Sequence, residues 1–202
     1  MILKISAKKR ILVAYSSKYG YVEEIITKIS DALYKKGFLV DLLNLSKINQ
    51  KKWPSLEEFD GLIVGSCGSS LGPFWRKEAK NFVSRNLEKL SSTDKILGFF
   101  YSDPRILNLI IDPSGAQKVA ANSMYSTFGF VPKYSLDFGP AFDLAHGFKK
   151  ISPEDRDRIR RIVKAISKKT GIEFNFKGFN DFRDWNLIQE FVDQFSNDII
   201  QK

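Results

Sequence analysis

The sequence contains one cysteine, Cys67, and one histidine, His146, among its 202 residues. A single cysteine excludes an internal disulfide, and one cysteine with one histidine cannot make a usual zinc site. No apolar run approaches about 20 residues, so we expect no membrane span. The N-terminal stretch also lacks the apolar segment of a secretory signal. We therefore expect a cytoplasmic protein without a metal centre.

The overall composition is that of a folded protein, with 43% hydrophobic and 27% charged residues. We expect a single domain over residues 1–202. The net charge is +9, and residues 149–169 carry nine Lys or Arg against three Asp or Glu. Such a region suits an anionic partner, namely a membrane surface, an acidic substrate or nucleic acid, or it is a solvated helix face. Because no aromatic residues are interleaved with these cations, we do not expect nucleic acid to bind.

Patterns of buried strands and amphipathic helices alternate along most of the chain. We expect strands near residues 11–14, 38–43, 59–65, 95–101 and 134–138, and helices near residues 22–33, 75–90, 116–128, 153–166 and 182–200. Residues 103–132 break the alternation and form an insert after the fourth strand. The pattern predicts an α/β fold whose parallel sheet has helices on both faces.

The turn after the first expected strand is a candidate phosphate site. It contains Ser16, Ser17 and Gly20, and it leads directly into a helix, whose first amides and dipole favour an anion. The turn has neither the Gly-x-Gly-x-x-Gly pattern of dinucleotide sites nor the Gly-x-x-x-x-Gly-Lys-Ser/Thr pattern of nucleoside triphosphate sites. The candidate ligand that remains is a terminal phosphate monoester. The alternative is an ordinary turn, without a ligand, in which serine caps the helix.

Three loops should meet where the parallel strands end, because ligands of such sheets bind at the carboxyl edge. The loops are residues 16–21, residues 66–75 and the segment from Ser102 onward, and all three are rich in serine, glycine or aromatic residues. The response-regulator version of this sheet requires acidic residues at these strand ends. Tyr15, Gly65 and Ser66 supply none.

The strand and loop at residues 11–22, the segment at residues 59–69 and the strand ending at Tyr101 resemble the flavodoxin-like FMN proteins. The resemblance implies a doubly wound five-stranded parallel sheet of order 2-1-3-4-5, with FMN as the cofactor. Val22 stands where that family often has a threonine hydroxyl. Within the group the chain is most similar to the menaquinone-dependent protoporphyrinogen IX dehydrogenases, including the Asn122-Ser-Met-Tyr segment and the pair Asp184-Trp185.

The resemblance also implies which residues bind FMN, although it assigns no catalytic residue. The first loop would hold the phosphate, and the loops after the third and fourth strands would contact the flavin ring. The implied residues are Ser16, Ser17, Lys18, Tyr19, Gly20, Tyr21, Val22, Ser66, Cys67, Gly68, Ser69, Tyr101, Ser102 and Asp103. Tyr101, Tyr19 or Trp75 would stack on the ring, or each is an ordinary packing residue. We expect Cys67 to be a small loop or core residue rather than a redox thiol.

Two functional classes follow. The first is an FMN oxidoreductase that takes hydrogen equivalents from an organic substrate, such as a porphyrinogen, and passes them to a quinone or another acceptor. The second is a one-electron carrier between proteins that has no substrate pocket. Because the net charge is +9, we expect a milder flavin potential than that of an acidic flavodoxin. The apolar patch at residues 106–111 would form a peripheral membrane or quinone contact, or it packs over the sheet edge. The oligomeric state is not assigned.

Overall fold

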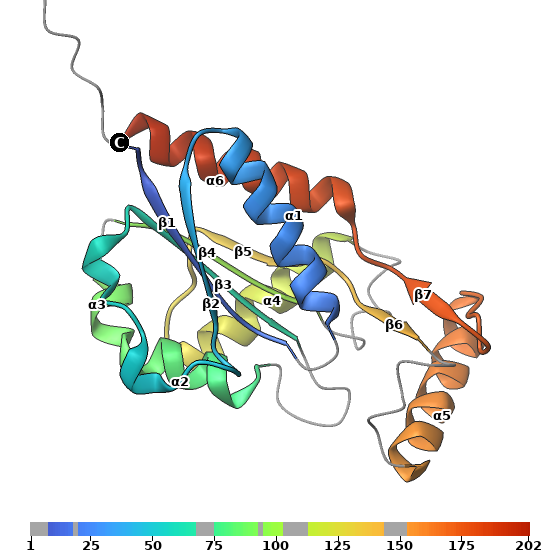
Figure 1. Cartoon of the computed structure of the whole chain (residues 1–202). Coiled ribbons are helices and arrows are strands. Elements are labelled where there is room, and N and C mark those ends of the chain that lie inside the picture. Colours follow the sequence, from blue (N-terminus) through green and yellow to red (C-terminus); the bar gives the residue numbers. More distant parts are fainter. Residues whose placement is uncertain (1–7, 18–19, 68–74, 93–94, 103–112, 144–152) are drawn as a thin grey trace, which may run out of the picture.

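The computed structural model of the protein describes residues 8–17, 20–67, 75–92, 95–102, 113–143 and 153–202. Its centre is a five-stranded parallel sheet (Figure 1). The strands are β1 (Arg10–Ser16), β2 (Leu39–Asn44), β3 (Gly61–Cys67), β4 (Ile96–Ser102) and β5 (Tyr134–Asp137), in the order β2-β1-β3-β4-β5. The predicted fold class and strand order are therefore confirmed. The continuous apolar run of β1 is explained by its burial on both faces.

One face of the sheet is covered by α1 (Tyr21–Lys35) and α6 (Trp185–Gln201) (Figure 1). Their apolar residues recur at helical spacing, and the sheet contributes Ile11, Val13 and Ile63 to the same core. The other face is covered by α2 (Lys77–Arg85), α3 (Leu87–Ser91) and α4 (Pro113–Phe128). Two short 3₁₀ helices, η1 (Gln50–Lys52) and η2 (Leu56–Glu58), lead from β2 into β3.

The helix expected over residues 75–90 is two helices in the structure. It is interrupted at Asn86, whose backbone has φ of −108° and ψ of 12°. The Asn86 side chain donates to the carbonyl of Phe82 over 2.8 Å. Asparagine competes with helical backbone hydrogen bonds in this way, so the continuous apolar spacing concealed the break.

A small second sheet forms beyond β5 and was not predicted from the sequence. It pairs β6 (Ala141–Asp143) with β7 (Phe179–Asp181) in antiparallel fashion. Between these strands lies α5 (Pro153–Thr170), which begins at the proline expected to open it. Val163, Ile166 and Phe174 form a separate apolar cluster there, and the unit stands beside the start of α1 (Figure 1).

The corner between β5 and β6 depends on Gly139, which has φ of 80°. A Cβ atom at this position would lie 2.1 Å from the backbone oxygen of Phe182. Gly129 provides a matched comparison, because it has φ of 77° but a Cβ atom there would meet nothing within 4 Å. The corner therefore combines a left-handed conformation with a close backbone approach.

We predict that Gly139→Ala lowers the free energy of unfolding more than Gly129→Ala does. Gly129→Ala should cost about 1 to 2 kcal/mol for the left-handed conformation alone. Gly139→Ala should cost about 1 to 3 kcal/mol more, because the backbone of Phe182 must move. Urea unfolding of both variants measures the difference, and equal losses would show that the close approach is unimportant.

Candidate functional site

The candidate site lies at the carboxyl edge of the sheet, where β1, β3 and β4 end side by side. The register pairs Ser16 with Ser66, and Cys67 with Ser102. The strand order reverses between β1 and β3, because the chain goes from β1 to β2 on one side and crosses back to β3 on the other. Loops diverge at such a point and leave a crevice for a ligand.

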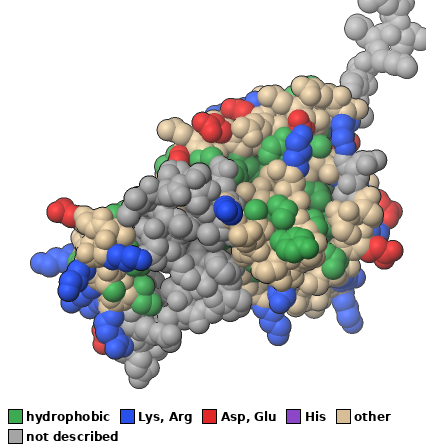
Figure 2. Space-filling view, turned by 180° about the vertical axis from the view of Figure 1, so that it is seen from behind, with side chains coloured by type: hydrophobic (Ala, Val, Ile, Leu, Met, Phe, Trp, Pro, Cys, Tyr) green, Lys and Arg blue, Asp and Glu red, His purple; other side chains and the backbone are tan. Residues whose placement is uncertain are grey.

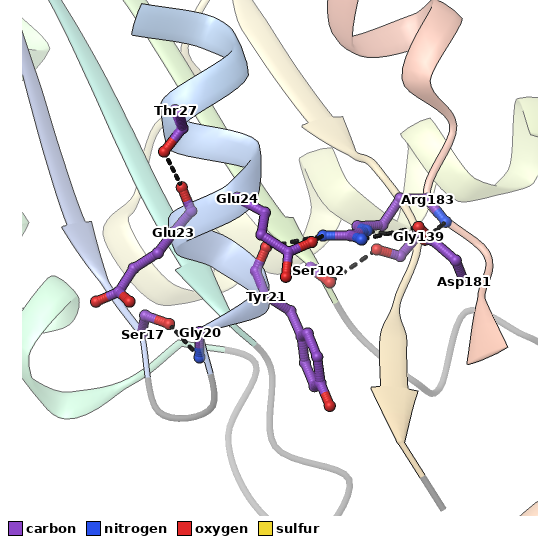
Figure 3. Close-up of polar contacts among 10 residues, drawn as sticks. All are labelled: Ser17, Gly20, Tyr21, Glu23, Glu24, Thr27, Ser102, Gly139, Asp181 and Arg183. Carbon is purple, nitrogen blue, oxygen red and sulfur yellow. Dashed lines mark hydrogen bonds and ion pairs between the residues drawn. The ribbon is translucent and has the colours of Figure 1, made fainter. Parts of the chain in front are cut away.

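The turn from β1 to α1 exposes the start of a helix. Gly20 is the N-cap of α1 and has φ of 93°, and no side chain caps the helix among the described residues. The Gly20 N–H donates instead to the Ser17 hydroxyl oxygen over 3.2 Å (Figure 3). This bond leaves the Ser17 O–H hydrogen to donate elsewhere. The turn thus offers a hydroxyl and helix amides to an anion.

Two acidic residues, Glu23 and Glu24, lie in the first turn of α1, next to this loop. Glu23 accepts a hydrogen bond from the Asn44 side chain over 3.2 Å and lies 3.7 Å from the Lys47 ammonium. Glu24 lies 2.7 Å from the Arg183 guanidinium. Both carboxylates therefore have cationic partners, which limits their repulsion of an anion at the helix start.

The two serines of the first loop lie in different environments. Ser16 is buried, and its hydroxyl accepts from Arg76 Nε over 2.9 Å and donates to Glu78 over 3.1 Å. The Arg76 backbone N–H also donates to the Ser66 hydroxyl over 3.1 Å. The sequence suggested that Ser16 and Ser17 act together on a phosphate. The Ser16 hydroxyl is bonded to Arg76 and Glu78 at the start of α2. Of the two serines, Ser17 is therefore the one whose hydroxyl hydrogen is available to a ligand in the loop.

The Glu78 carboxyl belongs to this same network. Burial raises its pKa, but its own backbone N–H, the charge of Arg76 and the Ser16 hydroxyl together lower its pKa below the ordinary value. Glu78 is therefore ionised at neutral pH and is paired with Arg76. The ends of β1 and β3 are both fastened to α2 through Arg76.

The aromatic residues proposed to stack on a ring, Trp75 and Tyr101, are core residues. Their side chains are 1% and 0% exposed, and their ring centroids are 6.1 Å apart. Both pack with Phe99 in the core beneath α2 and α4. The ordinary packing alternative therefore describes both residues, because the alternation of side chains along β4 directs Tyr101 into the core.

The remaining predicted residues are distributed around the edge. The Ser102 hydroxyl donates to the Gly139 carbonyl over 2.7 Å (Figure 3), and Cys67 is half-buried at the end of β3. Val22 is buried in the core with α1 and α6, so its side chain faces away from the loop. Tyr21 packs against Phe179, with ring centroids 5.7 Å apart. Five predicted residues lie outside the described residues: Lys18, Tyr19, Gly68, Ser69 and Asp103.

Arg183 is a site residue that the sequence reasoning missed. Its side chain is only 2% exposed, and it donates to the Tyr21 carbonyl over 3.2 Å while pairing with Glu24 (Figure 3). It also forms two side-chain hydrogen bonds of 2.8 Å with Asp181. The spacing of Asp181 and Arg183 gave a signal, since residues two apart on an extended segment share a face. Nothing in the sequence indicated that Arg183 contacts α1.

The charge states of this cluster follow from its contacts. Burial lowers the pKa of Arg183, but hydrogen bonds with Asp181 and Glu24 raise its pKa above the ordinary value. Burial raises the pKa of Asp181, and the hydrogen bonds and charge of Arg183 lower its pKa below the ordinary value. Arg183 and Asp181 are therefore both ionised at neutral pH, and Arg183 ties the end of β7 to the first turn of α1.

In the described part of the chain, no three His, Cys, Asp or Glu side chains are placed to hold a metal ion. No helix in the same part is both long enough and apolar enough to cross a membrane.

Comparisons with known proteins agree with the fold. The model of the flavodoxin domain family matches residues 12–102, which run from β1 to the end of β4. No curated protein sequence matches the chain.

Among solved structures, a flavodiiron core from Synechocystis has 13% identity and a TM-score of 0.53, covering 97% of this chain and 37% of its own. Rubredoxin oxygen:oxidoreductase from Desulfovibrio gigas has 16% identity and a TM-score of 0.47, covering 80% and 36%. A Fusobacterium nucleatum flavodoxin variant bound to flavin mononucleotide has 15% identity and a TM-score of 0.42, covering 96% of each chain. The chain thus spans little more than a third of the first two proteins.

We predict that Arg183→Gln lowers the free energy of unfolding by about 2 to 3 kcal/mol at neutral pH, because it removes the buried guanidinium and its charge-assisted hydrogen bonds to Asp181 and Glu24. Lys36→Gln is the control, since the exposed pair of Lys36 with Asp193 should contribute less than about 1 kcal/mol. Urea unfolding of both variants measures the two losses.

The loss in Arg183→Gln should also depend on pH. A carboxyl whose pKa is depressed on folding stabilises the protein above its unfolded pKa of about 3.9, and this stability disappears as the pH falls through the folded pKa. The gap between the wild type and Arg183→Gln should therefore shrink below about pH 4. A gap that stays constant from neutral to acidic pH would contradict the assignment of Asp181 as the main partner.

Proposed function

We propose that this protein binds FMN at the carboxyl edge of its sheet and transfers electrons through it. The observation that carries the proposal is the uncapped start of α1, opened by the turn from Ser17 to Gly20 at the point where the strand order reverses. The match of residues 12–102 to the flavodoxin domain covers this same edge. The Fusobacterium flavodoxin that resembles the chain binds flavin mononucleotide.

The described residues form part of a site that fits a phosphorylated flavin. Ser17 and the first amides of α1 would hold the phosphate, and the positive φ of Gly20 lets the backbone turn toward it. The ends of β3 and β4, at Cys67 and Ser102, would flank the ring. FMN supplies the redox chemistry, and the chain supplies binding, orientation and electrostatics. Tyr19 remains the proposed stacking residue.

We further propose that the protein acts on an organic substrate of its own, such as a porphyrinogen, and passes electrons to a quinone or another acceptor. The unit formed by β6, α5 and β7 supports this proposal, because it stands beside the start of α1 and is additional to the five-stranded sheet. Peripheral contact with a membrane and a cytoplasmic location stay predictions. The alternative is a one-electron carrier, for which this unit would serve only to dock a partner.

We predict that the purified protein binds one FMN and binds riboflavin at least about tenfold more weakly, because riboflavin lacks the phosphate that the start of α1 would hold. Titration followed by quenching of flavin fluorescence measures both affinities. Equal affinities would show that this loop does not hold a phosphate, and no binding of either flavin would overturn the proposal.

Ser17→Ala tests which hydroxyl takes part. It should weaken FMN binding by about 1 kcal/mol, or roughly fivefold, and leave riboflavin binding nearly unchanged. Ser46→Ala is the matched control, because the Ser46 hydroxyl bonds Ser16 in the neighbouring network. If both variants weaken FMN binding equally, Ser17 has no specific role.

We predict that the FMN-loaded protein oxidises protoporphyrinogen IX anaerobically when a soluble quinone analogue is present, with porphyrin fluorescence as the measurement. The flavin-free protein is the control for spontaneous oxidation. A protein whose flavin accepts electrons from a one-electron donor, but which forms no porphyrin above that control, would be a carrier instead.

A further inference from the structure

We infer that the outward face of α5 is a docking surface for an acidic electron-transfer protein. The surface consists of Arg161, Lys164 and Lys168, flanked by Arg160 and Lys169. The inference rests on the proposed electron-transfer function, and it goes further by naming the class of partner and the place where it binds.

The three central cations lie on one side of α5. At 100° per residue, Arg161, Lys164 and Lys168 are opposite Val163 and Ile166. The burial follows this geometry, because Val163 and Ile166 are buried whereas the three cations are exposed. Figure 2 shows Lys and Arg side chains gathered over this end of the molecule. The helix therefore packs by its apolar side and presents a basic side to the solvent.

The charge of this surface is not compensated within the described part of the chain. None of its five cations forms an ion pair with another side chain that the structure describes, and the acids of α5, Glu154, Asp155 and Asp157, all lie near its start. Other cations are paired, as shown by Lys36 with Asp193 and by Lys89 with Glu57. Unpaired cations on one face are available to the carboxylates of a partner, and they steer its approach.

The position of α5 connects this surface to the proposed flavin site. Val163 and Ile166 belong to an apolar cluster against which Tyr21, the first residue of α1, also packs. Phe179 contacts Tyr21 from β7, and Arg183 joins the same segment to Glu24. A protein docked on the outward face of α5 would lie about one helix diameter, ~10 Å, from this cluster, on the side of α5 that faces away from Tyr21.

The geometry favours a protein over a membrane or a nucleic acid. A helix that binds a membrane inserts its apolar side, but the apolar side of α5 is already buried against Phe174. None of the exposed large apolar side chains of the described residues belongs to α5. Surfaces that bind single-stranded nucleic acid combine cations with aromatic residues on which bases stack, and the described basic face has no aromatic residue. The feature that this face offers a partner is its positive charge, which is complementary to the surface of an acidic protein.

The test measures binding of the full-length protein to an immobilised plant-type [2Fe–2S] ferredoxin, an acidic one-electron carrier, by interferometry at about 50 mM NaCl. We expect Arg161→Glu/Lys164→Glu/Lys168→Glu to weaken binding at least about tenfold. The control Lys28→Glu/Lys51→Glu/Lys80→Glu reverses three exposed cations on other elements and should weaken binding less than about threefold.

Several results would overturn the inference. They are absence of binding by the wild type, equal weakening by the two triple variants, and binding to phosphatidylserine vesicles that depends on α5 when ferredoxin binding does not. Circular dichroism checks the folding of both variants, and replacement of the three α5 cations by glutamine serves if the glutamate variant does not fold. Because interferometry does not need the flavin, a failure of docking is distinguished from a failure of FMN binding, which the flavin titration reports separately.

Discussion

Parallel pairing of β1 along both of its edges is the constraint on which the rest of the structure depends. Val13 faces Leu42 of β2 on one side and Ile63 of β3 on the other. A strand enclosed in this way must be apolar on both faces, and each face must then be covered by helices. The same pairing brings the ends of β1 and β3 together, so the turn into α1 opens at the reversal of strand order. The candidate site is thus a consequence of how the core is built.

Two arginines fasten this edge, one on each side of the first loop. Arg76 joins the ends of β1 and β3 to α2 through Ser16 and Ser66, and Arg183 joins β7 to α1. Each guanidinium has its own carboxylate, Glu78 for Arg76 and Asp181 for Arg183. The charge of each arginine is therefore largely neutralised by its carboxylate. The anion affinity proposed for the loop thus depends on Ser17 and on the amides of α1.

The sheet and its main helices could be predicted from the sequence because their signals are local. Apolar runs marked the strands, and the spacing of Val22, Ile25 and Ile29 marked α1. The three-residue strands β6 and β7 were missed because so short a segment has no usable alternation. The hydrogen-bond partners of a hydroxyl could not be predicted from the sequence either. Ser16 and Ser17 are adjacent, but their hydroxyls bond to different elements. Prediction from pattern fails where a contact joins distant segments, and the bond between Arg183 and Tyr21 spans 162 residues.

That span has a consequence for the order of events during biosynthesis. A ribosome releases β1 and α1 long before it reaches Arg183, so a nascent chain holds Glu24 and the Tyr21 carbonyl without their buried cation. The first turn of α1 receives this partner after α5 and β7 have been translated. Maturation of the carboxyl edge is therefore a late step, and a chain that stops before Arg183 would lack a support of its first helix while retaining every strand of the main sheet.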